Sequence, residues 1–171
     1  VVEMVIAEDG AVLSSTLFRA LVHNHAKLAY NSVAAWLAGE VPAPDRVKAV
    51  SGLDGQLRLQ DQVAQRLKAR RHQQGALSLE TIEPRAVFEG EVLTDLRVEQ
   101  KNRAKELIED FMIAANQATA SYLKGKGMPS FRRILRSPER WQRIVEVAAR
   151  WGERLPSEPD AGALESFLIA R

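Results

Sequence analysis

The sequence of 171 residues contains no cysteine. That absence excludes disulfide bonds, thiol catalysis and thiolate-bound zinc, and it favours an intracellular, cytoplasmic location. Long hydrophobic runs are also missing, since no apolar stretch approaches the roughly 18 residues that cross a bilayer. The first residues lack the basic-then-apolar pattern of a signal peptide. We therefore expect no association with a membrane.

Neither sign of charge is in large excess. Lysine and arginine number 24 and aspartate and glutamate 22, which gives a net charge of +2. The whole chain is therefore not a polycation, although a sequence pI of about 9.1 leaves room for local basic patches. An apolar content of 46% is enough for one hydrophobic core. We expect residues 1–171 to belong to one domain, without a second domain, and the chain to be monomeric.

The chain begins with Val-Val-Glu-Met rather than with an initiator methionine. Its first residues already alternate between apolar and polar side chains, as in the interior of a β-sheet. We therefore expect this chain to be an internal portion of a longer polypeptide.

Periodicity in the first half of the chain predicts strands followed by helices. Alternation on both sides of a Glu-Asp-Gly turn predicts a β-hairpin, and apolar residues at helical spacing follow it. Glycine and proline then interrupt the pattern. The expected elements are a hairpin over residues 1–22, a helix over 30–38, a loop over 42–55 and a long amphipathic helix over 56–74.

The second half returns to strands and then to helices. A Glu-Gly turn divides a second hairpin, and the most regular helical pattern of the chain follows, with Asn102 as the candidate N-cap. The apolar face of this helix is expected to include Ile108 and Met112. The expected elements are a hairpin over residues 77–98, helices over 102–123, 138–151 and 160–170, and a strand over 130–135. The fold class is α+β, with antiparallel β-hairpins and long amphipathic helices packed on the sheet.

Two histidines, His23 and His25, invite a metal-binding interpretation. On a strand they would face the same side, as two ligands of one metal ion do, and His72 or a carboxylate would have to complete the site. The alternative is that both are polar residues of an edge or loop. We therefore assign no metal ligand within this chain.

Carboxylates are equally sparse where a magnesium site would need them. Phosphodiester hydrolysis with magnesium requires several carboxylates converging on the ions. The densest group is Glu106, Glu109 and Asp110 at the start of the long helix, where acidic residues also suit the helix dipole. Nucleophile motifs and phosphate-binding glycine loops are absent from the sequence. We assign no catalytic residue within this chain.

Basic residues are more suggestive. Five arginines fall within twelve residues, with Phe131 and Trp141 interleaved, and such a stretch can hold a phosphate backbone. A second basic group closes the helix before Gly75, where cations also satisfy the helix dipole. A solvated helix face is the alternative for each group. The residues are Arg132, Arg133, Arg136, Arg140 and Arg143 in the first group, and Arg66, Lys68, Arg70 and Arg71 in the second.

Tyr30 stands at a junction between strand and helix, close to Lys27. Single-stranded nucleic acid is held by base stacking on aromatic side chains within a positively charged groove, and these two residues form the smallest version of that arrangement. The alternative is a tyrosine half-buried against the short helix with its hydroxyl at the surface.

Three segments of the sequence resemble a known family. "ELIEDFMIAANQATASYL", residues 106–123, is similar to a segment of the RNB catalytic domain of the ribonuclease II and ribonuclease R family. "HNHAKLAYNSVAAWL" is similar to the family segment in which a basic residue, a leucine and a tyrosine open a helix. "SFRRILRSP" is a looser match to a third segment. Order and spacing agree across essentially the whole chain.

The resemblance implies a hydrolytic, processive exoribonuclease. Such an enzyme degrades single-stranded RNA from its 3′ end with Mg²⁺ and releases nucleoside 5′-monophosphates. It further implies that Tyr30 stacks on a base near the 3′ end and that Lys27 contacts a phosphate. Arg132, Arg133 and Arg136 are then expected to bind RNA as well. Glu109 and Asn116, the most family-like polar positions of the long helix, are expected to be structural or to support the site indirectly.

The chain also departs from the family pattern. The family's catalytic aspartates precede the matched part and its arginine-bearing motif follows it, so Mg²⁺ would be bound by residues outside this chain. This chain alone is not expected to cleave RNA. Leu135 and Arg136 stand where the family commonly has His and Glu. The alternative function is a non-catalytic RNA-binding or scaffold protein that keeps the RNB-like fold without the catalytic aspartates.

Overall fold

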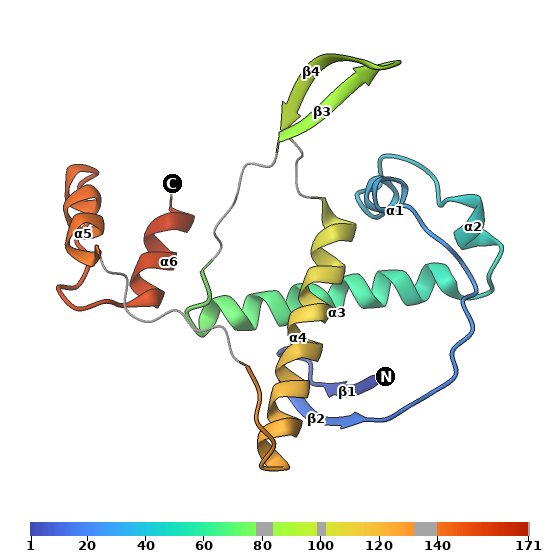
Figure 1. Cartoon of the computed structure of the whole chain (residues 1–171), viewed down its shortest axis with the longest axis horizontal. Helices are drawn as coiled ribbons and strands as arrows, with labels where there is room; N and C mark the ends of the chain where they lie inside the picture. Colours follow the sequence, from blue (N-terminus) through green and yellow to red (C-terminus); the bar gives the residue numbers. More distant parts are fainter. Residues whose placement is uncertain (78–83, 99–101, 132–139, 171) are drawn as a thin grey trace. The chain divides into compact units, whose positions relative to one another are not determined.

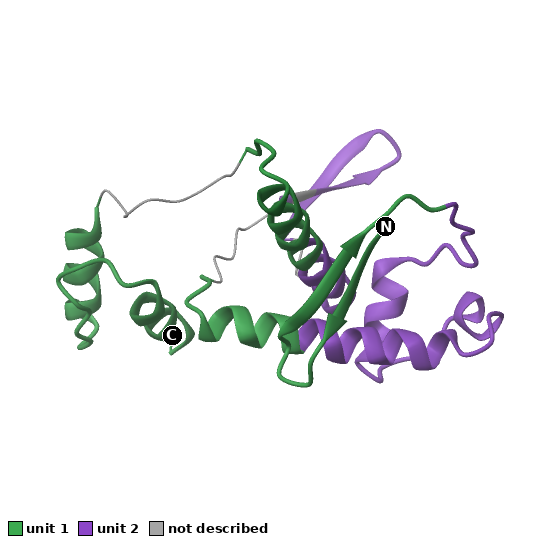
Figure 2. Ribbon diagram, turned by 90° about the horizontal axis from the view of Figure 1, so that it is seen from below, with its two compact units in different colours: residues 1–20, 66–78, 113–171 green, residues 21–65, 79–112 purple. Residues whose placement is uncertain are grey.

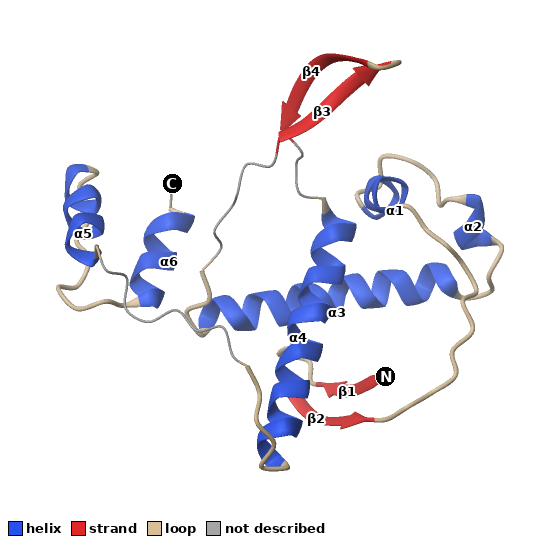
Figure 3. Cartoon of the chain, in the orientation of Figure 1, coloured by secondary structure: helices blue, strands red, loops and turns tan. Residues whose placement is uncertain are grey.

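The computed structural model describes residues 1–77, 84–98, 102–131 and 140–170. These residues form helices and two antiparallel hairpins, joined by loops (Figures 1 and 3). In chain order the elements are β1 (Val2–Ile6), β2 (Val12–Leu17), α1 (Tyr30–Leu37), α2 (Asp45–Lys48), α3 (Leu53–Gln73), β3 (Pro84–Glu89), β4 (Val92–Val98), α4 (Arg103–Gly125), α5 (Trp141–Arg150) and α6 (Ala161–Ile169).

The chain divides into two compact units (Figure 2). Helices α3 and α4 each contribute residues to both. Unit 1 consists of Val1–Ala20, Arg66–Ser78 and Ile113–Arg171, and unit 2 of Leu21–Gln65 and Leu79–Met112.

In unit 1 the turn between β1 and β2 is held against α3. Asp9 Oδ1 accepts a hydrogen bond from the backbone N–H of Ala11 at 3.0 Å, and Asp9 Oδ2 accepts one from Arg70 Nη1 at 2.6 Å. Gly10 has φ of 82°, and a Cβ atom there would lie 2.5 Å from the carbonyl oxygen of Arg66. Glycine is therefore required at this turn both for its backbone conformation and for the close approach of α3.

The C-terminal helices of unit 1 are fixed by polar contacts. Trp141 Nε1 donates to the carbonyl of Pro156 at 3.0 Å, and Asp160 caps α6 by accepting from the N–H of Ala163 at 2.9 Å. His72 Nδ1 lies 2.8 Å from Glu165 Oε1, whose side chain is 4% exposed. A buried carboxylate therefore faces an imidazole of α3 where α6 packs.

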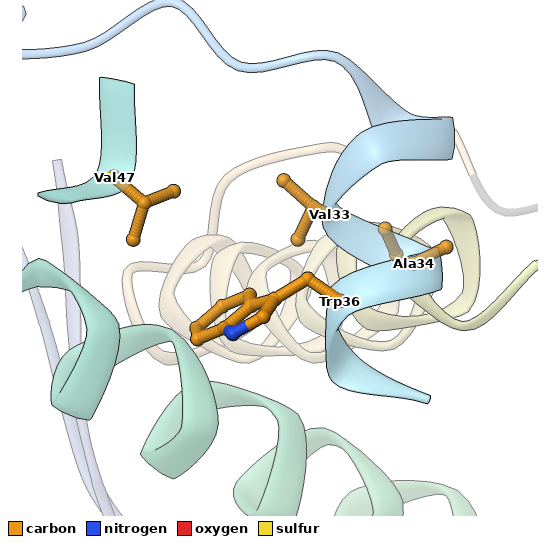
Figure 4. Close-up of a cluster of buried hydrophobic side chains, with 5 residues drawn as sticks. Val33, Ala34, Trp36 and Val47 are labelled. Carbon is orange, nitrogen blue, oxygen red and sulfur yellow. The ribbon is translucent and has the colours of Figure 1, made fainter. Parts of the chain in front are cut away.

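The core of unit 2 is built around α1 (Figure 4). Val33, Ala34 and Trp36 of α1 are buried together with Val47 of α2 and Ala104 of α4. The guanidinium of Arg58 lies 4.6 Å from the centre of the Trp36 ring, a cation–π contact. A helix of eight residues is marginal by itself, so this packing rather than helix propensity holds α1 in place.

The second hairpin belongs to unit 2 and presents its apolar side chains to solvent. Strands β3 and β4 pair antiparallel, from Pro84 opposite Val98 to Glu89 opposite Val92, with an irregularity after Val87. Exposed apolar side chains occur along both strands, namely Phe88, Val92, Leu93, Leu96 and Val98.

The α+β prediction is confirmed, and most helix bounds agree within a few residues. Asn102 does cap α4, since its Oδ1 accepts the backbone N–H of Lys105 at 3.0 Å. The loop predicted over residues 42–55 was wrong in part, because α2 lies within it. Residues 132–139, which include most of the predicted strand over 130–135, lie outside the described part of the chain.

The apolar face predicted for α4 was also partly wrong. Ile108 and Met112 are 41% and 59% exposed. The buried residues of α4 instead form a stripe of mainly small side chains, Ala104, Leu107, Asp110, Ala114 and Ala118. Alanine permits close approach of a neighbouring segment, so a mainly small stripe packs inward while Ile108 and Met112 lie at the surface.

Candidate nucleic-acid interface

Tyr30 is the first residue of α1 and is 49% exposed. Lys27 is exposed in the extended segment just before the helix. Between them, Leu28 is partly buried and packs against the core cluster of unit 2. Leu28 therefore anchors the segment, while the aromatic ring and the ammonium group stay accessible to a ligand.

The start of α1 has little capping of its own. Ala29 occupies the N-cap position in an extended conformation and supplies no side-chain hydrogen bond. An uncapped first turn leaves backbone N–H groups without intrahelical partners. The position of Tyr30 therefore depends on contacts made by the residues beside and after it.

One such contact joins α1 to the start of α4. Asn102 Nδ2 donates a hydrogen bond to Asn31 Oδ1 at 3.0 Å. The same side chain caps α4 through its oxygen, which accepts from Lys105. Because the cap fixes the amide with its oxygen toward α4, its NH₂ group is the end that faces Asn31.

A charged pair joins the first turn of α4 to α3. Arg103 makes two parallel hydrogen bonds to Asp61, of which the one from Nε to Oδ1 is 2.7 Å long. Asp61 is 5% exposed and also accepts from Gln65 at 3.0 Å. The hydrogen bond to Asp61 raises the pKa of Arg103, so this guanidinium stays charged.

The side chains of His23 and His25 lie in contact with each other. The rings of His23 and His25 are 5.0 Å apart in an edge-on arrangement, and both residues are exposed. Over the described ranges of the chain, no three His, Cys, Asp or Glu side chains gather as metal ligands would.

The arginine cluster is described only in part. Arg132, Arg133 and Arg136 lie outside the described residues, and their predicted contacts with RNA stay predictions. Arg140 and Arg143 are exposed near the start of α5.

The second basic group, at the end of α3, is not wholly available for binding a phosphate backbone. Arg70 is engaged by Asp9, so at least one of the four cations serves the fold of the first hairpin.

Glu109 and Asn116 are both exposed on α4. They are seven positions apart, which places them nearly above one another, two turns apart along the helix. Their predicted structural role stays a prediction.

Sequence reasoning missed the links from Asn102 to Asn31 and from Arg103 to Asp61. The N-cap pattern identified Asn102, but no local signal indicates that its second polar group bonds a residue 71 positions away. Arg103 and Asp61 are likewise 42 positions apart.

Comparison with known proteins identifies the family. The model of the RNB domain matches residues 1–166. The chain therefore belongs to the RNB domain family, and the resemblance inferred from its three segments is confirmed.

Two curated relatives illustrate the similarity. The chain is 33% identical over 139 residues to Ribonuclease R of Vibrio parahaemolyticus serotype O3:K6 (strain RIMD 2210633), covering 81% of this chain and 16% of that protein. It is 33% identical over 129 residues to Exoribonuclease 2 of Cronobacter sakazakii (strain ATCC BAA-894), covering 74% of this chain and 19% of that protein. The chain thus spans less than a quarter of the length of either.

Solved structures share the fold. The apo form of Mycoplasma genitalium RNase R superposes with a TM-score of 0.79 at 17% identity, over 98% of this chain and 26% of that one. The same protein in complex with ribose methylated single-stranded RNA gives a TM-score of 0.78 at 16% identity, again over 98% of this chain and 26% of that one.

Among the described residues, no helix has the length and hydrophobicity to cross a membrane.

Proposed function

We propose that the complete protein containing this chain is a hydrolytic, processive 3′-to-5′ exoribonuclease that acts on single-stranded RNA and releases nucleoside 5′-monophosphates. The observation that carries the proposal is the RNB domain match over residues 1–166. Relatives that are 33% identical to this chain are named Ribonuclease R and Exoribonuclease 2. The chain would be an internal portion of one domain in a monomeric, cytoplasmic enzyme.

Within that enzyme this chain contributes RNA-binding side chains. Tyr30 stacks on a base near the 3′ end, and Lys27 holds a neighbouring phosphate. Both side chains are accessible on a segment that the core of unit 2 holds in place, as a stacking platform requires. Arg132, Arg133 and Arg136 bind phosphates further along the strand. Glu109 and Asn116 of α4 have a structural role or support the site indirectly.

Mg²⁺ in this proposal is bound by residues outside the chain. Two of the chain's aspartates already have cationic partners, since Asp61 pairs with Arg103 and Asp9 with Arg70. In the described segments no carboxylates converge as the ion would require. The ion would supply charge neutralisation at the scissile phosphate, while this chain orients the strand.

A non-catalytic RNA-binding or scaffold protein is the alternative. The two functions differ in the sequence that precedes Val1 in the complete protein. A cluster of aspartates within a short loop of that preceding sequence would support the exoribonuclease function. Its absence would leave the non-catalytic alternative.

The stacking role of Tyr30 is tested with RNA labelled at its 5′ end. We expect the complete protein with Mg²⁺ to shorten the RNA from its 3′ end, and Tyr30→Ala to change the length of the final product. Removal of one base–aromatic stack is worth about 1–3 kcal/mol, which is large enough to move the end point. Product length is read on a sequencing gel.

Two control variants make this experiment specific. Tyr30→Phe keeps the ring and should leave the end product unchanged. Tyr122→Ala removes a different half-exposed tyrosine, 43% exposed, and should also leave it unchanged. The same end product from Tyr30→Ala and from the wild type would exclude Tyr30 from the RNA contact.

A further inference from the structure

The start of α1 is tied to α4 by a single amide side chain that serves two helices. Asn102 caps α4 through its oxygen and holds Asn31 through its nitrogen, each at 3.0 Å. Asn31 directly follows Tyr30. The residue that caps α4 is therefore also hydrogen-bonded, at the surface, to the side chain that follows the proposed stacking ring in the sequence.

The first turn of α4 is held by contacts with α3 and with the core cluster of unit 2. Arg103 is bound twice by the buried carboxylate of Asp61, and Ala104 is packed in the core cluster with Val33 and Ala34 of α1. Hydrogen bonds between a guanidinium and a carboxylate are directional as well as strong. Asn102 thus extends from a turn that is held on both its polar and its apolar side.

By contrast, the first turn of α1 is held by apolar packing but not by a side-chain cap. Val33 and Ala34 lie in the core one turn after Tyr30, but the N-cap residue Ala29 contributes no side-chain hydrogen bond. Helix ends without caps fray. The bond between the side chains of Asn102 and Asn31 therefore adds a contact to the turn of α1 where the N-cap residue supplies none.

We propose that Asn102 is a positioning residue for RNA binding, which holds Tyr30 in its stacking geometry before RNA arrives. The inference rests on the proposed function, because Tyr30 matters for RNA only if it stacks on a base. A ring that is already in place loses less conformational freedom when it binds. Loss of the link therefore weakens RNA binding without altering any group that touches the reacting phosphate.

The test separates the link from the helix cap. Asn102→Ser keeps a hydroxyl that caps α4 but is too short to reach Asn31. Asn31→Ala breaks the same link from the other side and leaves the cap of α4 intact. Neither variant adds charge near the RNA, so an electrostatic effect on phosphate binding is avoided.

In the complete protein, both variants should raise KM for single-stranded RNA about threefold to tenfold, the range that one neutral hydrogen bond supports, with kcat unchanged. A purely structural defect would instead lower the fraction of active enzyme, and so kcat. In a Tyr30→Ala background, Asn102→Ser should have no further effect on KM. Amide hydrogen exchange in residues 28–37 should become faster in Asn102→Ser.

The outcomes distinguish this inference from the proposed function. If the wild type shortens RNA and Tyr30→Ala changes the end product, but Asn102→Ser and Asn31→Ala keep the wild-type KM, only the inference is overturned. An additive effect of Asn102→Ser in the Tyr30→Ala background would also overturn it. Failure of the wild type to shorten RNA would overturn the proposed function, and the positioning role with it.

Discussion

Asp9 holds the turn of the first hairpin through both of its carboxylate oxygens. Its pKa is lowered, first by the hydrogen bond from the backbone N–H of Ala11 and further by the positive charge of Arg70. A carboxyl group whose pKa is lower in the folded state than in the unfolded state stabilises the fold above the unfolded value. That contribution is lost as the pH falls below 3.8 toward the folded value.

Asp9→Asn should therefore lower stability at neutral pH and lose its effect in acid. The amide keeps an oxygen for the N–H of Ala11 but has no charge for Arg70. We expect the difference in urea midpoint between wild type and variant to shrink as the pH falls from about 7 to about 2.

The matched control for this experiment is Glu8→Gln, which removes the same charge from the adjacent exposed residue. It should give a smaller change with pH. Parallel pH profiles for wild type and Asp9→Asn would show that the contact between Asp9 and Arg70 contributes no stability.

The elements of this chain depend on one another for stability. Helix α1 is short, and its N-cap residue makes no side-chain hydrogen bond. Packing in the core cluster of unit 2 holds it in place. The β1–β2 hairpin has only two strands, and such a hairpin is marginal alone. Its turn is secured by α3, whose backbone reaches Gly10. The stability of the β1–β2 hairpin therefore depends on the contact between its turn and α3.

Gly10→Ala tests that contact between elements. A Cβ atom at this position meets the backbone of Arg66 in addition to the strain of φ at 82°, so we expect a loss of at least about 2 kcal/mol of unfolding free energy. Gly39→Ala is the matched control, because its φ is 81° but the space around it is open. It should cost only about 1 kcal/mol. If both variants lose the same unfolding free energy in chemical denaturation, then α3 accommodates the added Cβ atom without loss of stability.

As a whole, the chain is expected to bind RNA without cleaving it. The RNA-binding candidates Tyr30 and Lys27 lie within it, but the described residues offer no cluster of carboxylates for Mg²⁺. Hydrolysis of a phosphodiester with magnesium depends on such a cluster. Activity therefore belongs to the complete protein in our proposal.

The corresponding prediction compares the 171-residue chain with the complete protein. The complete protein with Mg²⁺ should release nucleoside 5′-monophosphates from single-stranded RNA, and removal of the ion with EDTA should stop the release. The chain alone should release none under either condition. Chromatography of the products is the measurement, and mononucleotides released by the isolated chain would contradict the proposed division of roles.

Local sequence determined much of this fold and the place of the candidate site. The helical spacing after Tyr30, the Glu-Asp-Gly turn and the N-cap at Asn102 all depend on residues within a few positions of one another, so pattern alone predicted them. The segment around Tyr30 also carried the family resemblance, which the RNB domain match confirms.

Only the tertiary structure decided which distant residues meet. The partners Asp9 and Arg70 are 61 positions apart, and Asn31 and Asn102 are 71 apart. The exposure of Ile108 and Met112 followed from the small residues that α4 turns inward. Periodicity fixes which residues share a helix face, but it does not specify which neighbouring segment covers that face or which polar groups meet there, because these depend on packing between segments far apart in sequence.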